Sequence, residues 1–224
     1  MKKKNSRRML YVVLVLMVML LALSDAMIEK YKTVSVSSNV EKKVAITFDD
    51  GPNPDYTPDL LKGLKERGVS ATFFLLGKEA EKYPELVLQM YEEGHLLATH
   101  SYAHVNLCNL NDEAAVEQVV KTNTIIEEIT GECPQFIRPP FGCWKENLDY
   151  KTTMIPVLWD VDPLDWNTNN TAVIVKRVLT SVEDGDIILL HDASQSSVDA
   201  ALLIIDQLQK EGYLFVTVEE MVLD

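Results

Sequence analysis

The chain has 224 residues, of which 47% are hydrophobic, and its formal net charge is −13 at pH 7. This length and apolar content are sufficient for one domain with a sizeable core. The strong negative charge argues against a nucleic-acid partner and offers no electrostatic attraction to anionic lipid.

The N-terminus has the pattern of an export signal. Five Lys or Arg residues lie within the first eight positions, fifteen apolar residues follow over 9–23, and Ser24-Asp25-Ala26 forms a small-x-Ala cleavage site. The apolar stretch is shorter than the roughly 20 residues that span a bilayer. Two outcomes therefore stay open: cleavage after Ala26 with secretion, or retention as an anchor with the cationic start in the cytoplasm and the rest outside. We assign residues 1–29 to a signal peptide or membrane anchor.

A short exposed linker and a single folded domain are predicted after this leader. Residues 30–43 are rich in Ser and Thr and form the linker. Over 44–224, apolar runs alternate with amphipathic segments, which predicts strands interleaved with helices. The predicted strands are 44–48, 71–76, 95–98, 136–137, 154–159, 186–190 and 213–218, and the predicted helices are 57–67, 84–93, 112–130, 171–181 and 198–211.

The strands favour a parallel sheet because runs such as 187–190 are apolar throughout, as in strands buried on both faces. Either an open doubly wound sheet or a closed barrel fits this α/β pattern. In both, reactive groups gather at the carboxyl ends of the strands.

The first predicted strand ends at two adjacent carboxylates, Asp49 and Asp50, followed by the turn residues Gly51 and Pro52. Neighbouring strand residues point to opposite faces, but a turn that starts there can bring both side chains into one cleft. Two carboxylates at such a short distance repel each other unless a cation neutralises one of them. The pair therefore suggests one metal ligand and one group for proton transfer. For Asp-Asp-Gly taken alone, solvated turn aspartates are the favoured interpretation, and the rest of the chain overturns it.

Two histidines four residues apart, His100 and His104, follow the third predicted strand. On a helical turn this spacing would put both imidazoles on one face, where they could bind one cation. Together with Asp50 they would form a His₂-carboxylate set with open coordination positions, which is typical of a catalytic metal site. Cys108 continues the spacing and is a rival ligand that would favour a structural site.

Three further segments carry groups suited to catalysis. Arg138 begins the rigid segment Arg-Pro-Pro-Phe-Gly and could hold a carboxylate by a bidentate hydrogen bond. Residues 162–166 offer an acid that could orient a histidine and an indole that could form a pocket wall. His191 ends the most apolar strand and is well placed as a general acid, whereas His95 has no carboxylate partner nearby in the sequence and is predicted to be structural.

The chain has three cysteines, Cys108, Cys133 and Cys143, so a dense disulfide framework is excluded. In an exported chain, Cys133 and Cys143 could form a disulfide that encloses the loop carrying Arg138. Sequence spacing alone does not select this pairing.

Five of these segments together resemble the motifs of the polysaccharide deacetylase (NodB homology) family, also called carbohydrate esterase family four. The matching stretches are TFDDG, H-S-x-x-H, R-P-P-F-G, D-x-x-D-W and L-L-H-D, in the family's order and within residues 44–218. One departure is Phe141, where many members carry tyrosine. The resemblance implies a distorted, incomplete (β/α) barrel with parallel strands and outer helices.

The resemblance also implies roles at the metal site. Asp49 would be the general base, steadied by Arg138. Asp50, His100 and His104 would bind one divalent ion. Zinc is the preferred ion, and cobalt, nickel or manganese are the alternatives.

The remaining roles concern the leaving group and the substrate. His191 would be the general acid, supported by Asp165, while Trp166 and Leu189 would line an acetyl pocket and Phe141 would contribute its backbone N–H to the oxyanion hole. The implied substrate is an N-acetylated amino sugar in a polymer. Export favours N-acetylglucosamine of peptidoglycan over chitin oligomers or an exopolysaccharide, and a non-catalytic carbohydrate-binding protein is the alternative from another class.

Overall fold

The computed structural model describes Met17, Met19 and residues 42–223. The predicted leader 1–29 and linker 30–43 therefore lie outside the described residues, apart from the two methionines and the last two linker residues. Within the described part, the structure contains no helix long and apolar enough to span a membrane.

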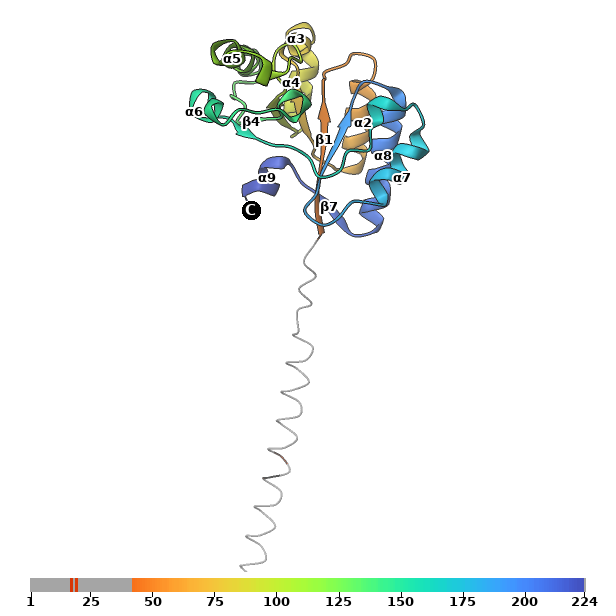
Figure 1. Cartoon of the computed structure of the whole chain (residues 1–224). Helices are drawn as coiled ribbons and strands as arrows, with labels where there is room; N and C mark the ends of the chain where they lie inside the picture. The colour runs from red at the N-terminus through yellow and green to blue at the C-terminus, as the bar shows by residue number, and fades with distance from the viewer. Residues whose placement is uncertain (1–16, 18, 20–41, 224) are drawn as a thin grey trace, which may run out of the picture. The chain divides into compact units, whose positions relative to one another are not determined.

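The described domain contains a sheet of seven parallel strands with helices in the connections (Figure 1). The strands are β1 (Lys42–Asp49), β2 (Thr72–Leu75), β3 (Leu96–Thr99), β4 (Phe136–Ile137), β5 (Ile155–Pro156), β6 (Ile187–His191) and β7 (Tyr213–Phe215). The helices are α2 (Thr57–Arg67), α3 (Gly77–Lys82), α4 (Pro84–Glu92), α5 (Asp112–Thr130), α6 (Asp149–Thr152), α7 (Thr171–Leu179), α8 (Gln195–Lys210) and α9 (Val218–Leu223).

The strand order is β5-β4-β3-β2-β1-β6, and β7 pairs with the first residues of β1. In Figure 1, α3, α4 and α5 lie on one side of β1 and α2, α7 and α8 lie on the other. The sheet curls into a half-barrel with the helices outside. This architecture confirms the α/β class and the distorted, incomplete barrel that the family resemblance implies.

The curl is completed by the segment after β5, where the sequence predicts a strand over 154–159. Only Ile155 and Pro156 belong to the strand, and the last bond to β4 runs from Val157 N to Ile137 O at 2.8 Å. The proline, which has no N–H, is tolerated because β5 lies at the edge of the described sheet. The following residues cross to β6, where Val161 forms a bridge with Ile188 and accepts a hydrogen bond from Leu189 N at 2.9 Å. The predicted strand is therefore mostly a crossover.

Alternation along β1 separates the core from the site. Val44, Ile46 and Phe48 pack in the core formed with the outer helices, while Ala45 packs in a second cluster on the opposite face. Because side chains alternate with a period of two, Asp49 lies on the same face as Ala45. The side chain of Asp49, the last residue of the strand, therefore points into the interior of the half-barrel.

Strand register brings the functional ends of the strands to one level. Asp49 of β1 is paired with His191 of β6, and Thr99, which precedes His100, is paired with Ile137, which precedes Arg138. Parallel strands share the direction of their carboxyl ends. The sheet therefore gathers these residues on one rim.

The C-terminal segment differs from the predicted strand over 213–218, which the structure ends at Phe215. Thr217 N donates to Glu220 Oε2 at 2.8 Å, and Glu220 N donates to Thr217 Oγ1 at 3.3 Å. This reciprocal pair is a capping box, and the Thr-x-x-Glu spacing that announces it is visible in the sequence. It begins α9, whose Val218 joins the inner cluster.

Replacing Thr217 with alanine is expected to lower the free energy of unfolding by about 1 kcal/mol, because an N-cap hydroxyl is lost. Urea denaturation followed by circular dichroism measures the change. Thr180→Ala is the control, because that hydroxyl donates only to the carbonyls of Lys176 and Arg177 in the last turn of α7. Equal stability of the Thr217 variant and the native protein would show that the cap contributes nothing.

Candidate active site

Both carboxylates at the end of β1 face one cleft, as the sequence predicts. Asp49 is the last strand residue and is 3% exposed, while Asp50 has a φ of 74°. This left-handed conformation is unusual for a residue other than glycine, and it turns the Asp50 carboxylate toward the cleft that Asp49 also lines.

The side chains of Asp50, His100 and His104 meet at the rim. Asp50 Oδ1 lies 3.6 Å from His100 Nε2 and 3.5 Å from His104 Nε2, and one ligand atom from each of the three residues falls within 4.8 Å of the others. Asp50 Oδ1 is buried and has no hydrogen-bond partner among the described residues. An unpartnered carboxylate oxygen beside two imidazole nitrogens fits a divalent cation.

The two histidines come together without the predicted helical turn. Residues 100–104 form a loop in which Ser101 and His104 have φ values of 66° and 54°. The carbonyl oxygens of Ser101 and Tyr102 accept hydrogen bonds, each of 3.0 Å, from Gly77 N and Lys78 N at the start of α3. These carbonyls accept from N–H groups of α3, so they are not used in a helical turn over 100–104. The conformation of the loop brings the two imidazoles together.

His100 is held in the tautomer that a metal ligand needs. Its Nδ1 donates to Arg138 O at 2.6 Å, so the lone pair of Nε2 points toward Asp50. Burial lowers the pKa of His100 despite the nearby carboxylates, which favours the neutral imidazole. A backbone carbonyl behind a histidine ligand is a common orienting partner.

The cysteine predictions are wrong. Cys108 is bonded to Cys143, and Cys133 is a free, exposed thiol. Cys108 is therefore not a rival metal ligand, and the Cys133–Cys143 pairing does not form. The chain folds the loops after β3 and β4 together, and this proximity is invisible in the sequence spacing.

Arg138 holds the first carboxylate from inside the barrel. It is fully buried, and its Nη1 donates to Asp49 Oδ1 and to Thr47 Oγ1, each at 2.7 Å. Its Nη2 donates to Leu158 O at 3.0 Å. The contact with Asp49 is therefore not the predicted bidentate pair, because the second nitrogen is used by a backbone carbonyl.

His191 is oriented by Asp165, which lies in the 3₁₀ turn Asp165–Asn167. His191 Nδ1 donates to Asp165 Oδ1 at 2.8 Å, and His191 N donates to Asp165 Oδ2 at 2.9 Å. Burial alone would lower the pKa of His191, but the hydrogen bond and charge of Asp165, with the charges of Asp49 and Asp50, raise it to about 9. The imidazole is thus protonated near neutral pH with its Nε2 away from Asp165.

These groups border a cleft of about 530 Å³. Phe141 and Trp166 lie exposed on its edge, at 67% and 64%, and Leu189 is buried in its wall. Phe141 has a φ of 61°, and its ring meets His104 edge-on with 4.9 Å between centroids. All ten residues predicted for the site are therefore in this cleft or hydrogen-bonded to a residue that lines it.

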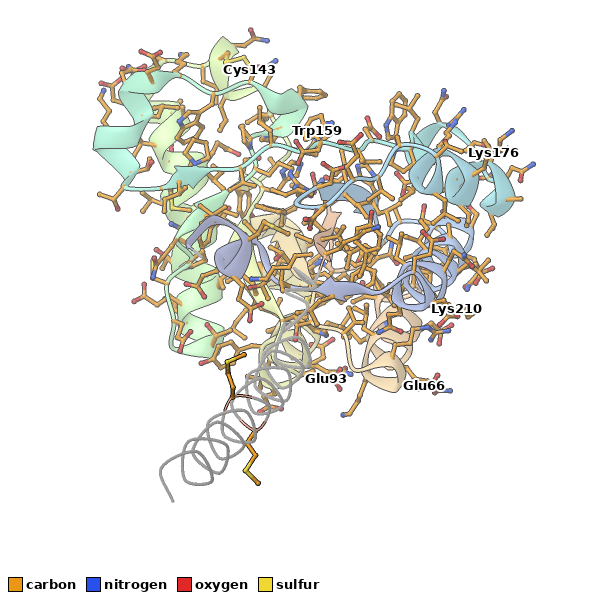
Figure 2. The ribbon with its side chains drawn as sticks, turned by 90° about the horizontal axis from the view of Figure 1, so that it is seen from below. Glu66, Glu93, Cys143, Trp159, Lys176 and Lys210 are labelled. Atoms are coloured by element: carbon orange, nitrogen blue, oxygen red, sulfur yellow. A yellow bond between two sulfur atoms is a disulfide. The ribbon has the colours of Figure 1, made fainter. Side chains whose placement is uncertain are left out.

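Sequence reasoning missed several residues around the cleft. Thr47 shares the Arg138 contact, and Trp159, labelled in Figure 2, lines the cleft with Asp162 and Pro139. The alternation of β1 could have indicated Thr47, since it lies two residues before Asp49.

A second buried acid, Asp192, supports the turn after Asp50. It accepts a hydrogen bond from Thr57 Oγ1, and burial raises its pKa to about 6. A Cβ at position 51 would come within 2.6 Å of Asp192 Oδ2, so a larger residue there would displace the buried carboxylate. The signal in the sequence was the acid directly after His191.

His95 is structural, as predicted. Its Nδ1 accepts a hydrogen bond from Ala71 N at 3.1 Å, and burial lowers its pKa to about 4. It precedes β3 and thus lies at the end of the sheet opposite to the rim.

The model of the polysaccharide deacetylase family matches residues 37–156 of this chain, more than half of its length. The chain belongs to the polysaccharide deacetylase family. The matched region contains the Asp50, His100 and His104 cluster as well as Arg138 and Phe141.

Named relatives in this family act on peptidoglycan. The chain is 42% identical over 181 residues to peptidoglycan-N-acetylmuramic acid deacetylase PdaC of Bacillus subtilis, a match that covers 81% of this chain and 39% of PdaC. It is 40% identical over 201 residues to a peptidoglycan-N-acetylglucosamine deacetylase of Bacillus cereus, covering 87% of this chain and 73% of that protein. The chain thus spans about two fifths of the length of PdaC and most of the second polysaccharide deacetylase.

A solved structure of the peptidoglycan deacetylase PdaC from Bacillus subtilis has the same fold. The TM-score is 0.79 at 42% identity, and the match covers 81% of this chain and 90% of the solved one. The half-barrel is therefore the polysaccharide deacetylase fold.

Proposed function

We propose that this protein is a metal-dependent hydrolase that removes N-acetyl groups from amino sugars of an extracellular polymer, with N-acetylglucosamine of peptidoglycan as its substrate. The observation that carries the proposal is the register of β1 and β6. It sets a candidate base, Asp49, beside a candidate acid, His191, at the edge of the Asp50, His100 and His104 cluster.

Asp50, His100 and His104 would hold one divalent ion, and we propose zinc, with cobalt, nickel and manganese as the ions to compare. The neutral His100 and the unpartnered Asp50 Oδ1 support this donor set. When bound, such an ion supplies Lewis acidity that polarises a carbonyl oxygen and lowers the pKa of water to about 7.

The side chains of the protein would then move two protons. Asp49, which Arg138 holds through Oδ1, would accept a proton from the attacking water on its other oxygen. The Phe141 N–H would donate to the oxyanion of the tetrahedral intermediate, an interaction worth about 3 kcal/mol. His191, with Asp165 on its Nδ1, would protonate the departing nitrogen from its Nε2, so that the acetamide and water become acetate and an amine.

The acetyl group would lie against Trp166 and Leu189, which border the cleft beside His191. An indole edge and an aliphatic wall suit a methyl group. The relatives, which are named as peptidoglycan deacetylases, support peptidoglycan as the polymer.

We also propose that the protein works outside the cytoplasm, either held by residues 1–29 in the membrane or secreted after cleavage at Ala26. The Cys108–Cys143 disulfide supports an oxidising location, where such bonds persist. Mass determination of the N-terminus after expression in a bacterial host distinguishes the anchored form from the secreted form.

Acetate release from purified peptidoglycan, with and without a chelator, tests the function. We expect release that stops with the chelator and returns with zinc, and mass spectrometry of the digested glycan then identifies the sugar that has lost its acetyl group. Faster acetate release from chitin oligomers or an exopolysaccharide would mean that this polymer, and not peptidoglycan, is the substrate. Binding to glycan without any acetate release would favour the non-catalytic alternative.

Asp165→Asn is expected to move the alkaline limit of activity to lower pH. His191 must be protonated to act as an acid, so activity falls as the pH rises through its pKa, and the carboxylate of Asp165 raises that pKa. Without this charge, the pKa falls back toward or below its ordinary value of 6.5. A bound dication lowers the pKa in both proteins, so the measured quantity is the difference between their profiles of kcat/KM against pH.

Asp162→Asn is the control for this pH prediction. Asp162 lines the same cleft, but its carboxylate accepts from Leu164 N instead of a histidine. Identical alkaline limits in the Asp165 variant and the native protein would refute the assignment of His191 as the acid that Asp165 supports.

A further inference from the structure

The disulfide joins the two loops that carry the least-anchored groups of the site. Cys108 lies in the 3₁₀ turn Leu107–Asn109, four residues after His104, and Cys143 directly follows the 3₁₀ turn Pro140–Gly142, two residues after Phe141. Figure 2 shows Cys143 at the edge of the ribbon, with Trp159 between it and Lys176 in this view. Both cysteines are half-buried, and the bond is close in sequence to both groups.

His104 differs from His100 in how it is held. His100 donates to a backbone carbonyl, but His104 forms no hydrogen bond within the described part of the chain. Its close neighbours are Asp50 at 3.5 Å, the ring of His100 and the exposed ring of Phe141. A histidine ligand normally has an orienting partner on its second nitrogen. The backbone before His104 is held at Ser101 O, Tyr102 O and Ala103 N, but the position of the imidazole itself depends on how the rest of the loop is fixed.

The backbone at these positions also needs support. His104 and Phe141 both have left-handed φ values, 54° and 61°, which cost energy for bulky residues and persist only where the surroundings impose them. The strand ladder contributes little, because β3 and β4 share a single register pair, Thr99 with Ile137.

Polar contacts beyond the disulfide join the same two loops at their outer ends. Lys145 Nζ donates to Leu110 O at 2.5 Å, and Lys151 Nζ donates to Asp112 Oδ2 at 2.9 Å. The first is a partly buried hydrogen bond to a carbonyl, and the second is an exposed ion pair, which contributes little stability. Leu107 and Leu148 also pack in one buried cluster, with Trp144 against it, so the disulfide is the covalent link beside an apolar contact.

We infer that Cys108 and Cys143 are positioning residues for the reaction: their disulfide holds the His104 loop against Phe141, and so keeps the third ligand of the metal site and the oxyanion donor in place. This inference rests on the proposed function for its kinetic part only. Loss of the bond lets the His104 loop move, which weakens metal binding and lowers kcat.

The test compares the full-length double variant C108A/C143A with the native protein. We expect zinc affinity, measured without substrate by competition with a chromophoric chelator, to fall about tenfold or more, the range seen when a partner that orients a metal ligand is lost. We expect kcat for acetate release to fall by about 10- to 100-fold, with a much smaller change in KM. Denatured native protein should show one free thiol.

Cys133→Ala is the matched control, because this exposed thiol lies outside the disulfide. It should leave zinc affinity and kcat unchanged. Near-ultraviolet circular dichroism and a melting curve establish that each variant is folded at the assay temperature.

If the double variant does not fold, the folded native protein is reduced with a phosphine, which takes an oxygen atom from water as the disulfide becomes two thiols. A phosphine is preferred to a dithiol, since thiolates bind zinc. The same loss of zinc affinity is expected, with three thiols titrated after denaturation.

A bond that only stabilises the fold would lower the melting temperature but leave zinc affinity and kcat of the folded protein unchanged, and this result would overturn the inference. Three free thiols in protein made under oxidising conditions would also overturn it. Native protein that releases no acetate would refute the proposed function, while the zinc measurements would still decide the role of the disulfide.

Discussion

Asp49→Asn is expected to lower kcat for acetate release by about 10²- to 10⁴-fold, the contribution of a positioned general base, while the protein still binds its metal ion. Asparagine has the shape of aspartate, and its oxygen can still accept the hydrogen bond that Arg138 Nη1 donates at 2.7 Å. The amide cannot take a proton from water near neutral pH. Turnover should therefore be lost without loss of the site.

The measurement is kcat by acetate release, with the metal content of the same samples from elemental analysis. Arg138 keeps its contacts with Thr47 Oγ1 and Leu158 O in the variant, so the buried guanidinium is not left without partners. Normal acetate release by Asp49→Asn would refute the base assignment. Loss of the metal along with turnover would mean that Asp49 is a ligand rather than a base.

His100→Ala is expected to remove metal binding and turnover together, with activity at or below the detection limit. His100 supplies a buried Nε2 to the cluster with Asp50 and His104, and the remaining pair of ligands cannot hold an ion tightly. Zinc affinity and acetate release are measured on the same preparation. Asp50→Asn should behave in the same way, because a neutral amide oxygen is a poor substitute for a carboxylate.

His95→Ala is the matched control for the loss of a buried imidazole. His95 is 6% exposed and His100 is 4% exposed, but His95 bonds to Ala71 N far from the rim. Both variants lose stability because each leaves a cavity and an unpaired backbone group. Only the His100 variant should lose the ion at a temperature where both are folded, and retained zinc in that variant would contradict the proposed ligand set.

The elements of the domain follow closely from local sequence signals. The helix predicted over 57–67 is observed with the same bounds, since Pro58 suits its first turn and Gly68 ends it with a φ of 62°. The buried strand over 44–48 and the short strand 136–137 were equally clear. The chain order of the five motifs was sufficient to indicate the family and to select ten residues that the structure gathers in or beside one cleft.

Local signals failed where the backbone serves a tertiary contact. The loop with His100 and His104 is not helical, because α3 uses its carbonyls, and the strand predicted over 154–159 is a crossover to β6. The C-terminal helix α9 was missed although its capping box is written in the sequence. A pattern of apolar residues does not say which partner will satisfy a backbone group.

What the sequence by itself determined was the inventory: which strands end in reactive side chains, and which chemistry those side chains can perform. The tertiary structure alone decided which of them meet. It paired Cys108 with Cys143 instead of Cys133, and it directed one nitrogen of Arg138 to Asp49 and another to Leu158 O. The physical reason is that spacing along a chain fixes periodicity within one element, whereas contacts between loops depend on strand register and on how the whole sheet curls.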